Sequence, residues 1–377
     1  QECPKSAYVA RLSADNFGIY IPVTANNDCD DIIEKARLLI EKQSHEIKVL
    51  DDTVRVTLTA GAFVCYGTEN ISAESIMKNG EIASKSARSY KTPILELFKS
   101  RLEDELEETF DIQNKLYDAF DNEEFEVYYQ PQYSIKDGSV YGLEALVRWI
   151  RDGRVIAAPD KFIPLLETNG QIHKLTNLVL NKVCTDIKTF DHEGYPELCV
   201  AVNVSGREVN DKYAYKDFKR IVSKHGISPS RLKLEITETV LFQLNPQNDS
   251  PIQDFIDSGY QIAIDDFGTG YANFNYLQSI SASTLKLDKS YTQNIGKCDK
   301  SNDLIKAIIA FASALGCATI AEGVETAEQW DFLIDANCSS IQGYKYAKPM
   351  PLAETIQFLS SQLATSNPAL LPRQASA

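Results

Sequence analysis

Histidine is scarce in this sequence, and neither histidine nor cysteine is clustered. The four histidines stand far apart, and the eight cysteines form no CxxC pair. A zinc hydrolase needs several of these side chains close together, so the sequence argues against this class of enzyme. The cysteines are also too few and too irregular for a disulfide scaffold. We therefore expect reduced thiols in a cytoplasmic protein.

Basic residues are outnumbered by acidic ones. The chain has 38 Lys and Arg against 53 Asp and Glu, which gives a formal net charge of −15, and no run of Lys and Arg interrupts this excess. Proteins that bind nucleic-acid polymers or anionic membranes concentrate basic side chains on one face. The charge therefore predicts that neither is a direct partner of this fragment.

Long apolar runs are absent as well. The longest, residues 307–321, contains Ser313, Gly316 and Thr319, and it predicts a helix end followed by a strand rather than a membrane span. The chain starts at Gln1 with no initiating Met and no signal-like segment. We expect a fragment of a longer protein, either cytoplasmic or the cytoplasmic part of a membrane-anchored sensor.

The length predicts more than one domain, because cores larger than about 250–300 residues usually divide. Residues 1–92 predict a partial α+β domain, and residues 93–124 predict an amphipathic connecting helix, since apolar residues recur there every three or four positions. The acidic residues of this helix are interpreted as a solvated face rather than a metal site. Residues 364–377, rich in Pro, Ser and Ala, predict a loose tail. The expected elements of the first region are strands at 8–12, 17–22 and 53–60 and helices at 30–45 and 73–88.

Short apolar strands alternate with longer helical stretches through residues 125–363. Eight strands in a stretch of this size are typical of an α/β fold, the TIM-like (βα)8 barrel. Only Ile135–Gly138 joins the first two strands, which leaves no room for a crossover helix, so one strand is predicted to run antiparallel. The expected strands are 125–133, 140–149, 198–204, 232–237, 261–265, 284–288, 318–322 and 340–344.

Polar side chains occupy the carboxyl end of nearly every predicted strand. In a barrel of this type those ends meet at one mouth, where catalytic residues collect. Interior charges are costly unless they are paired or bound to a metal, so chance does not explain the set. It comprises Glu144 with Arg148, Asn203, Glu235, Asp265 with Asp266, Lys286 with Asp288, Glu322 and Gln342.

Five carboxylates and one Asn amide, without histidine or cysteine nearby, form an all-oxygen ligand set that suits Mg²⁺ or Mn²⁺. Because Asp265 and Asp266 are adjacent, each can face a different ion. Two ions about 3.5–4 Å apart are best suited to hydrolysis at phosphorus. Taken singly, each acid is equally well explained as a salt-bridged or capping residue, and this alternative stays open for every position.

Six motifs in these strands resemble the EAL family, the bacterial cyclic di-GMP phosphodiesterases. The resemblance covers residues 125–363. It implies a barrel with one antiparallel strand, two Mg²⁺ or Mn²⁺ ions, a homodimer through the barrel, and hydrolysis of cyclic di-GMP, a second messenger in biofilm formation, to linear pGpG. The motifs are Glu144-Ala145-Leu146 with Arg148, Leu234–Glu238, Asp265–Tyr271, Leu285–Asp288, Ala321–Glu325 and Gln342-Gly343-Tyr344.

The resemblance implies a role for each matched position. Lys286 lies beside the nucleophilic water, Glu325 assists activity near the substrate, and Glu238 anchors the loop at residues 267–276. The implied metal ligands are Glu144, Asn203, Glu235, Asp265, Asp266 and, through water, Glu322. The implied substrate contacts are Leu146, Arg148, Asp288 and Gln342. Two alternatives stay open: Arg148 pairs with an interior acid, and Gln342 caps a loop.

Residues Arg11–Phe17 resemble the signature turn of a GGDEF diguanylate cyclase in degenerate form. Ser13 and Ala14 replace glycines, and Asn16 replaces an acid. The turn therefore provides neither the close backbone approach to a nucleotide nor the negative charge for a metal. The first half of that domain, which precedes the signature, is not in this chain. We predict a partial domain without cyclase activity.

Two other functions compete with hydrolysis. A receptor would bind cyclic di-GMP without cleaving it and signal through the connecting helix, and degenerate ligands would be its mark, which the sequence does not show. A protein-interaction scaffold would leave many interior acids without a stabilising purpose. Metal-dependent turnover separates the enzyme from the receptor.

Overall fold

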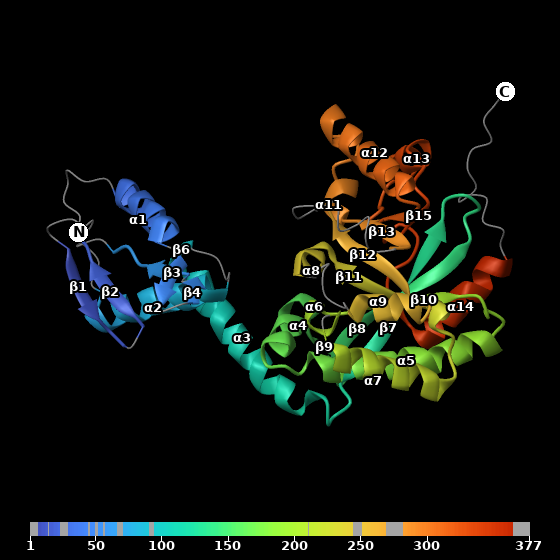
Figure 1. Ribbon diagram of the computed structural model, residues 1–377, viewed down its shortest axis with the longest axis horizontal. Coiled ribbons are helices and arrows are strands. Elements are labelled where there is room, and N and C mark those ends of the chain that lie inside the picture. Colours follow the sequence, from blue (N-terminus) through green and yellow to red (C-terminus); the bar gives the residue numbers. More distant parts are fainter. Residues whose placement is uncertain are drawn as a thin grey trace. The chain divides into compact units, whose positions relative to one another are not determined.

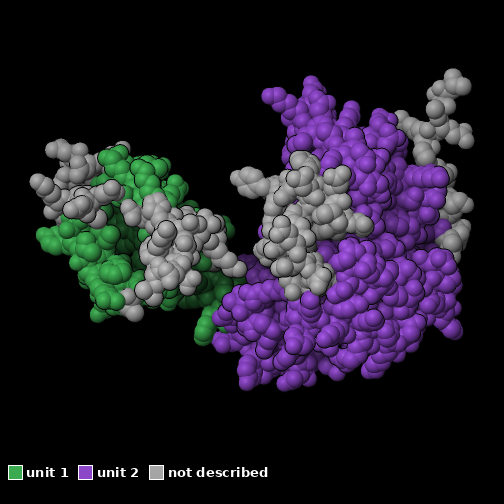
Figure 2. Space-filling view, viewed as in Figure 1, with its two compact units in different colours: residues 1–111 green, residues 112–377 purple. Residues whose placement is uncertain are grey.

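The computed structural model divides the chain into two compact units, residues 1–111 and residues 112–377 (Figure 2). In the described part of the chain, no helix is both long and apolar enough to cross a membrane. The seven cysteines within it carry free thiols, and the predicted tail beyond residue 364 lies outside it. The structure describes residues 7–13, 15–22, 29–43, 46–49, 52–55, 57–65, 71–89, 94–209, 211–243, 251–268 and 282–364.

The first unit has the predicted α+β character (Figure 1). Its elements are β1 (Tyr8–Arg11), β2 (Phe17–Tyr20), α1 (Cys29–Gln43), β3 (Glu46–Val49), β4 (Asp52–Arg55), β5 (Thr59–Ala62), α2 (Ala73–Ser89) and β6 (Ile94–Leu97). Among the described residues the strands form three pairs. The pairs β1–β2 and β3–β4 are antiparallel, and β5–β6 is parallel. Helix α2 packs closely on β5, where a Cβ on Gly61 would lie 2.0 Å from the Ser84 amide nitrogen.

The single strand predicted at residues 53–60 is wrong, because the chain changes its pairing partner within that stretch. β4 pairs antiparallel with β3, a strand that the sequence did not predict, whereas β5 pairs parallel with β6. β-branched residues run through β4, the residues that follow it and the start of β5. Because the same residue types favour both strands, composition does not mark the break between them.

The connecting helix predicted over residues 93–124 is too long, and its first part is a strand. Helix α3 covers Ser100–Ala119, whereas residues 94–97 form β6. Phe98 continues this pairing by donating its amide to Ala62 O at 2.7 Å. Closely spaced apolar residues fit a short strand as well as a helix turn, so periodicity alone did not separate the two.

The apolar residues of α3 belong to two different cores. Leu102 packs with Ile82 of α2 in the first unit, whereas Ile112 and Leu116 are part of the core of the second unit. The boundary between the compact units accordingly falls inside this helix, after Asp111. The helix is therefore an element of both units rather than a separate linker.

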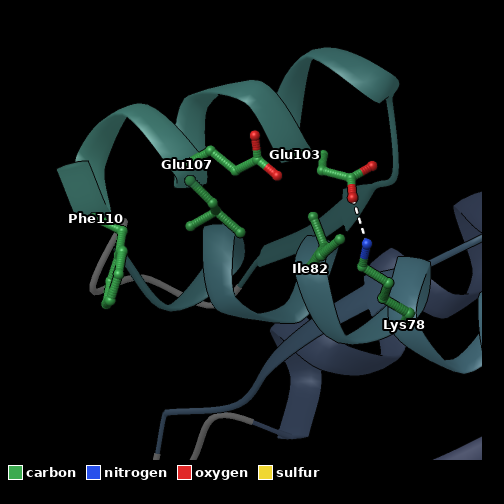
Figure 3. A pocket seen from close by; sticks show the side chains of 6 residues that line it. Lys78, Ile82, Glu103, Glu107 and Phe110 are labelled. Atoms are coloured by element: carbon green, nitrogen blue, oxygen red, sulfur yellow. Dashed lines mark hydrogen bonds and ion pairs between the residues drawn. The ribbon is translucent and has the colours of Figure 1, made fainter.

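A groove lies between α2 and α3 in the first unit (Figure 3). Apolar side chains of Ile82, Leu106 and Phe110 line it together with an ion pair, in which Lys78 Nζ lies 2.5 Å from Glu103 Oε1. None of its lining residues belongs to the predicted site. Exposed ion pairs of this kind contribute little to stability.

The second unit is a closed barrel of eight strands (Figure 1). These are β7 (Phe125–Ser134), β8 (Val140–Arg151), β10 (Cys199–Asn203), β11 (Leu232–Thr237), β12 (Gln261–Phe267), β13 (Thr284–Leu287), β14 (Ala318–Ala321) and β15 (Ser340–Ile341). From β8 to β15 neighbouring strands are parallel. β7 runs antiparallel to both β8 and β15 and closes the barrel. The TIM-like barrel with one antiparallel strand is confirmed.

Helices cover the outside of the barrel, and two short strands extend it (Figure 1). The helices are α4 (Pro159–Thr168), α5 (Ile172–His192), α6 (Gly206–Val209), α7 (Lys212–His225), η1 (Pro229–Arg231), α8 (Glu238–Gln243), α9 (Pro251–Asp257), α11 (Lys289–Thr292), α12 (Asp299–Ala314), α13 (Ala327–Asp335) and α14 (Leu352–Ala364). β9 (Arg154–Ala157) pairs with β8, and β16 (Met350–Pro351) pairs with β7; neither was predicted. Local signals set several helix ends: Thr326 and Gln329 form a capping box at α13.

Gly343 follows β15 at a place that has no room for a side chain. A Cβ there would lie 2.2 Å from Val324 O and 2.4 Å from Val324 N, and backbone atoms cannot rotate away. We predict that Gly343→Ala lowers the free energy of unfolding of the barrel by about 3 kcal/mol. Urea denaturation followed by tryptophan fluorescence measures this loss, because both tryptophans lie in the second unit.

Gly80 provides the contrasting control. It lies inside α2, and no atom lies within 4 Å of a Cβ built on it. Gly80→Ala should therefore leave the barrel transition that tryptophan fluorescence follows unchanged. In the first unit it should be stabilising by about 0.5–1 kcal/mol, because alanine loses less backbone entropy in a helix. A barrel that tolerates Gly343→Ala without loss would show that the contact with Val324 is not tight.

Candidate functional site

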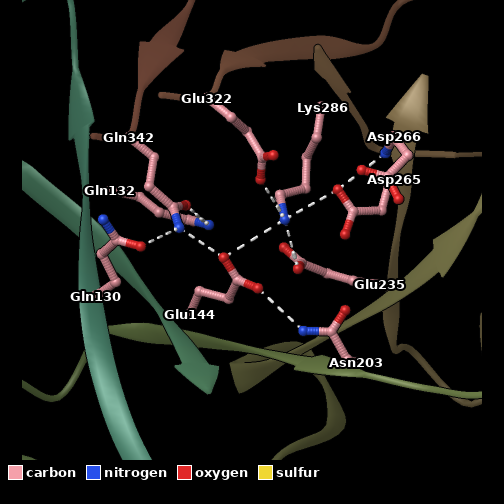
Figure 4. Close-up of polar contacts among 10 residues, drawn as sticks. All are labelled: Gln130, Gln132, Glu144, Asn203, Glu235, Asp265, Asp266, Lys286, Glu322 and Gln342. Atoms are coloured by element: carbon pink, nitrogen blue, oxygen red, sulfur yellow. Dashed lines mark hydrogen bonds and ion pairs between the residues drawn. The ribbon is translucent and has the colours of Figure 1, made fainter. Parts of the chain in front are cut away.

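Lys286 lies at the centre of the predicted site, with four carboxylates around its ammonium group (Figure 4). Its Nζ atom lies 2.7 Å from Glu235 Oε2, 2.8 Å from Glu322 Oε1, 3.1 Å from Asp265 Oδ1 and 3.5 Å from Glu144 Oε2. The lysine is fully buried. Burial removes water from an ammonium group, so it needs such partners. The strand ends bring these five residues together at one point.

Amide side chains hold Glu144 from the other side (Figure 4). Asn203 Nδ2 donates to Glu144 Oε1 at 2.9 Å, and Gln342 Nε2 donates to Glu144 Oε2 at 2.5 Å. Gln342 Nε2 also donates to Gln130 Oε1 at 3.0 Å, and Gln342 Oε1 accepts from Gln132 Nε2 at 3.1 Å. Gln342 thus lies in an interior amide network rather than capping a loop. The sequence analysis missed both β7 glutamines, although their spacing of two places them on one face of the strand.

A bulge at the end of β12 turns two adjacent aspartates toward the same mouth. Neighbouring residues of a regular strand point to opposite faces, but the register between β12 and β13 shifts between Ile264 and Phe267. Asp266 has a φ of 52°, in the left-handed region, and its amide donates to Asp265 Oδ1 at 3.0 Å. A bulge of this kind re-aims side chains. Oxygen atoms of Asp265, Asp266 and Glu322 consequently lie within 4.8 Å of one another.

Burial and crowding shift the pKa values in the cluster. Burial raises the pKa of Glu235 well above its ordinary value, and the charge of Glu144 adds to this. Burial likewise raises the pKa of Glu322 to about 7. For Lys286, burial lowers the pKa, but the surrounding carboxylates outweigh burial and leave the pKa well above its ordinary value. The surrounding carboxylates therefore favour the charged form of Lys286.

The cluster has the donor chemistry of a hard divalent cation site. Carboxylate oxygens predominate, and Asn203 presents an amide, without sulfur or imidazole ligands. Glu235 Oε1 is buried and has no hydrogen-bond partner among the described residues, although buried polar atoms are normally satisfied. Five carboxyl groups share one ammonium, and the raised pKa values of Glu235 and Glu322 reflect burial and this crowding. These observations fit a site for divalent metal.

Glu238, the predicted loop anchor, contacts the backbone just beyond the two aspartates. Its Oε2 atom accepts a hydrogen bond from the Gly268 amide at 2.7 Å, and its side chain is buried. The loop begins at Phe267 and Gly268, and its predicted continuation, including Tyr271, lies outside the described residues. The contact is consistent with an anchor at the start of this loop.

Two predicted substrate contacts, Leu146 and Arg148, lie beyond Glu144 on the same face of β8. Arg148 is half-buried; its Nη1 donates to Val147 O at 2.9 Å, and its guanidinium lies over the Tyr128 ring, 5.9 Å from the ring centre. In the described part of the chain no ion pair joins Arg148 to an interior acid. The alternative that the sequence left open for Arg148 is therefore not observed.

Asp288 and Glu325 also lie outside the carboxylate cluster. Asp288 is the N-cap of α11, where its Oδ1 accepts from the Ser290 amide at 2.9 Å. Glu325 has an exposed side chain, and its amide donates to Gln329 Oε1 at 2.7 Å. Each residue thus makes a local structural contact, and its role near a substrate stays a prediction.

The turn after Asn203 is anchored by two acids that the sequence analysis missed. Glu208 of α6 is buried and accepts hydrogen bonds from the Ser205 amide at 3.2 Å and from Thr176 Oγ1 at 2.8 Å. Ser205 Oγ donates to Glu167 Oε1 at 2.6 Å. These bonds tie the turn to α4 and α5 directly after a residue of the cluster. No local pattern marks such contacts, because the three elements are distant in sequence.

Lys286 provides a test of the charge balance in the cluster. Removing its ammonium leaves four carboxylates without compensation. We predict that Lys286→Met lowers the free energy of unfolding of the metal-free protein by about 3–5 kcal/mol. Mn²⁺ should recover part of the loss, because it neutralises the same carboxylates. Urea denaturation in EDTA and in Mn²⁺ measures both effects.

Lys233 is the matched control. It is also buried in the barrel, on β11, but its Nζ lies over the Tyr141 ring, 5.6 Å from the ring centre. Among the described residues no carboxylate forms an ion pair with it, and burial lowers its pKa. Lys233→Met should therefore leave stability unchanged or raise it. Equal losses in the two variants would contradict the role given to the carboxylates around Lys286.

Known proteins are similar to this chain in sequence. Residues 113–349 match the EAL domain family, and residues 1–92 match the diguanylate cyclase GGDEF domain family. The chain is 29% identical over 365 residues to the cyclic di-GMP phosphodiesterase NbdA of Pseudomonas aeruginosa, covering 97% of this chain and 46% of NbdA. It is 27% identical over 348 residues to MucR of the same organism, a bifunctional diguanylate cyclase/cyclic di-GMP phosphodiesterase, covering 92% of this chain and 50% of MucR. The chain thus spans about half the length of these relatives.

Solved structures share the architecture. The PaMucR phosphodiesterase in complex with c-di-GMP has a TM-score of 0.60 at 29% identity, covering 65% of this chain and 99% of that chain. The EAL enzyme Bd1971 in its cAMP-bound form has a TM-score of 0.63 at 28% identity, covering 69% and 72%. The family match, residues 113–349, extends over more than half of the sequence and over most of the barrel. The chain therefore belongs to the EAL domain family.

Proposed function

We propose that this chain hydrolyses cyclic di-GMP to linear pGpG with two Mg²⁺ or Mn²⁺ ions, and thereby lowers the level of a bacterial second messenger. The observation that carries the proposal is the convergence of four carboxylates on one buried lysine, with a fifth carboxylate beside them. The relatives NbdA and MucR are cyclic di-GMP phosphodiesterases by name. The similar PaMucR structure holds c-di-GMP.

The oxygen donors of the cluster would hold the two ions. The bulge contains both Asp265 and Asp266, and each aspartate would serve a different ion. Two divalent ions supply Lewis acidity to the attacking water and neutralise charge at phosphorus. The proposed ligands are Glu144, Asn203, Glu235, Asp265, Asp266 and, through water, Glu322.

Charged and amide side chains around these ligands would orient the phosphodiester and stabilise its transition state. Lys286 keeps its charge at neutral pH, and a fixed ammonium stabilises negative charge that develops on phosphorus oxygens. Arg148 carries a guanidinium that matches phosphate in a bidentate manner. Gln342 is held in one orientation by the glutamines of β7. Leu146 and Asp288 are further proposed substrate contacts, and Glu325 is a proposed assisting residue.

The first unit is proposed to have no cyclase activity. At the turn that resembles the GGDEF signature, Arg88 of α2 donates to Asn16 Oδ1, and Asn16 Nδ2 donates to Ser13 Oγ at 2.9 Å. Protein groups thus engage both ends of this amide, which also lacks the charge that a metal ligand would provide. GTP with Mg²⁺ is expected to yield neither cyclic di-GMP nor its hydrolysis product pGpG, and the appearance of either nucleotide in chromatography would overturn this proposal.

Cyclic di-GMP is also the proposed partner of this chain. We propose that the chain acts in the cytoplasm, and its excess of acidic residues argues against direct contact with anionic membranes or nucleic-acid polymers. The family resemblance implies a homodimer through the barrel, a state that sedimentation velocity measures directly.

We predict that the chain converts cyclic di-GMP to pGpG in Mg²⁺ or Mn²⁺ and that EDTA abolishes the conversion. Glu235→Gln removes a buried ligand charge and should lower turnover at least about 100-fold. Lys233→Met, which changes a buried lysine outside the cluster, should retain turnover. Chromatographic separation of cyclic di-GMP from pGpG measures the turnover of the wild type, with metal and in EDTA, and of both variants.

Two outcomes would decide against hydrolysis. Folded protein that yields no pGpG with either ion refutes the proposal. Calorimetric binding of cyclic di-GMP that remains intact for hours identifies a receptor instead.

A further inference from the structure

Both backbone polar groups of Gly268 are bonded, directly after the proposed metal ligands of β12. Its amide donates to Glu238 Oε2 at 2.7 Å, and its carbonyl oxygen accepts from the hydroxyl of Tyr291. Gly268 has a φ of 94°, and a Cβ built there would lie 2.5 Å from Tyr291 Oη. Glycine therefore suits both the conformation and the close approach of the tyrosine. Two side chains, Glu238 of α8 and Tyr291 of α11, thus hold the backbone of Gly268.

Asp288 shapes the turn that carries Tyr291 to Gly268. Its Oδ1 accepts the Ser290 amide at 2.9 Å, and its backbone oxygen accepts the Tyr291 amide at 3.0 Å. These bonds form the first turn of α11 directly after β13. The tyrosine is thus placed by the same strand that presents Lys286.

This arrangement brackets Asp266 on both sides. On one side, Lys286 Nζ lies 3.1 Å from Asp265 Oδ1; on the other, Tyr291 holds Gly268. Between them Asp266 has a φ of 52°, a left-handed conformation that is uncommon for residues other than glycine. Such a conformation persists only where its surroundings determine it. The contacts on either side of Asp266 hold its backbone in this conformation.

We propose that Tyr291 is a positioning residue for the metal site, whose hydroxyl fixes the backbone at Gly268 and through it the direction of the Asp266 carboxylate. Glu238 alone holds only the Gly268 amide. Without the hydroxyl, the backbone tilts about that bond, and Asp266 leaves the group of cluster oxygens in a fraction of the molecules. For its relevance to turnover, this inference rests on the proposed function.

The ring of Tyr291 has a separate role, because it packs against the barrel core. Tyr291→Phe keeps the ring and removes only the hydroxyl. Tyr215→Phe is a matched control on α7, outside the barrel, where the hydroxyl bonds to Ser258 Oγ at 2.7 Å. Both variants lose one tyrosine hydroxyl hydrogen bond. An effect seen only in Tyr291→Phe therefore comes from the bond to Gly268.

The primary measurement is the Mn²⁺ affinity of the intact chain, obtained by titration calorimetry without nucleotide. One neutral hydrogen bond corresponds to roughly a two- to tenfold effect. Tyr291→Phe is expected to weaken Mn²⁺ binding and to lower kcat by about this factor, with KM for cyclic di-GMP near the wild-type value. Excess Mn²⁺ should restore part of kcat. The Tm should fall no further than in Tyr215→Phe, which should keep wild-type Mn²⁺ affinity.

Wild-type Mn²⁺ affinity and kcat in Tyr291→Phe would overturn the proposal, as would equal losses of affinity in Tyr215→Phe. If Tyr291→Phe weakens Mn²⁺ binding but the wild-type chain cleaves no cyclic di-GMP, the positioning role stands and the proposed hydrolysis fails. If the wild-type chain cleaves the nucleotide and Tyr291→Phe is unaffected, hydrolysis stands and positioning fails. A wild-type chain that binds no Mn²⁺ overturns both.

Discussion

The ammonium of Lys286 and the carboxylates around it form the interaction on which the barrel interior depends. Moving one ammonium and four carboxylates out of water carries a large free-energy penalty. This penalty is offset only when the acids at the ends of four other strands lie 2.7–3.5 Å from Lys286 Nζ on β13. A slip of one residue in any of these strands would turn its acid to the opposite face. The cluster therefore constrains the strand register as much as it defines the site.

Two departures from a regular parallel barrel build the rest of the site. β7 runs antiparallel between β8 and β15, so its two glutamines reach Gln342 and, through it, Glu144. The bulge in β12 turns Asp266 toward the mouth, where a regular strand would point it away. Sequences depart from local regularity mainly where function requires it, and both departures here occur beside the acidic cluster.

Helix α3 has a single amphipathic pattern, but its apolar residues pack in the cores of two different units. The buried cluster of the first unit is small among the described residues, with Ile82 and Leu102 as its larger members. The second half of the same helix packs in the large core of the barrel through Ile112 and Leu116. Small cores supply little stability. The two halves of α3 therefore pack in cores of different size.

The sequence by itself determined the eight barrel strands, the antiparallel first strand and the residues at the strand ends, because periodicity and position at a strand end are local properties. It did not determine the break between β4 and β5 or the start of α3, where the same residue types satisfy two structures. Nor did it determine the partners of the cluster, which come from distant elements: Gln130, Gln132, Glu167, Glu208 and Tyr291. Arg148, Asp288 and Glu325 stay outside the carboxylate cluster, and their implied roles near a substrate stay predictions. Only the tertiary structure decided which polar side chains point to one place, since that direction depends on strand register, on the bulge and on the φ of Asp266.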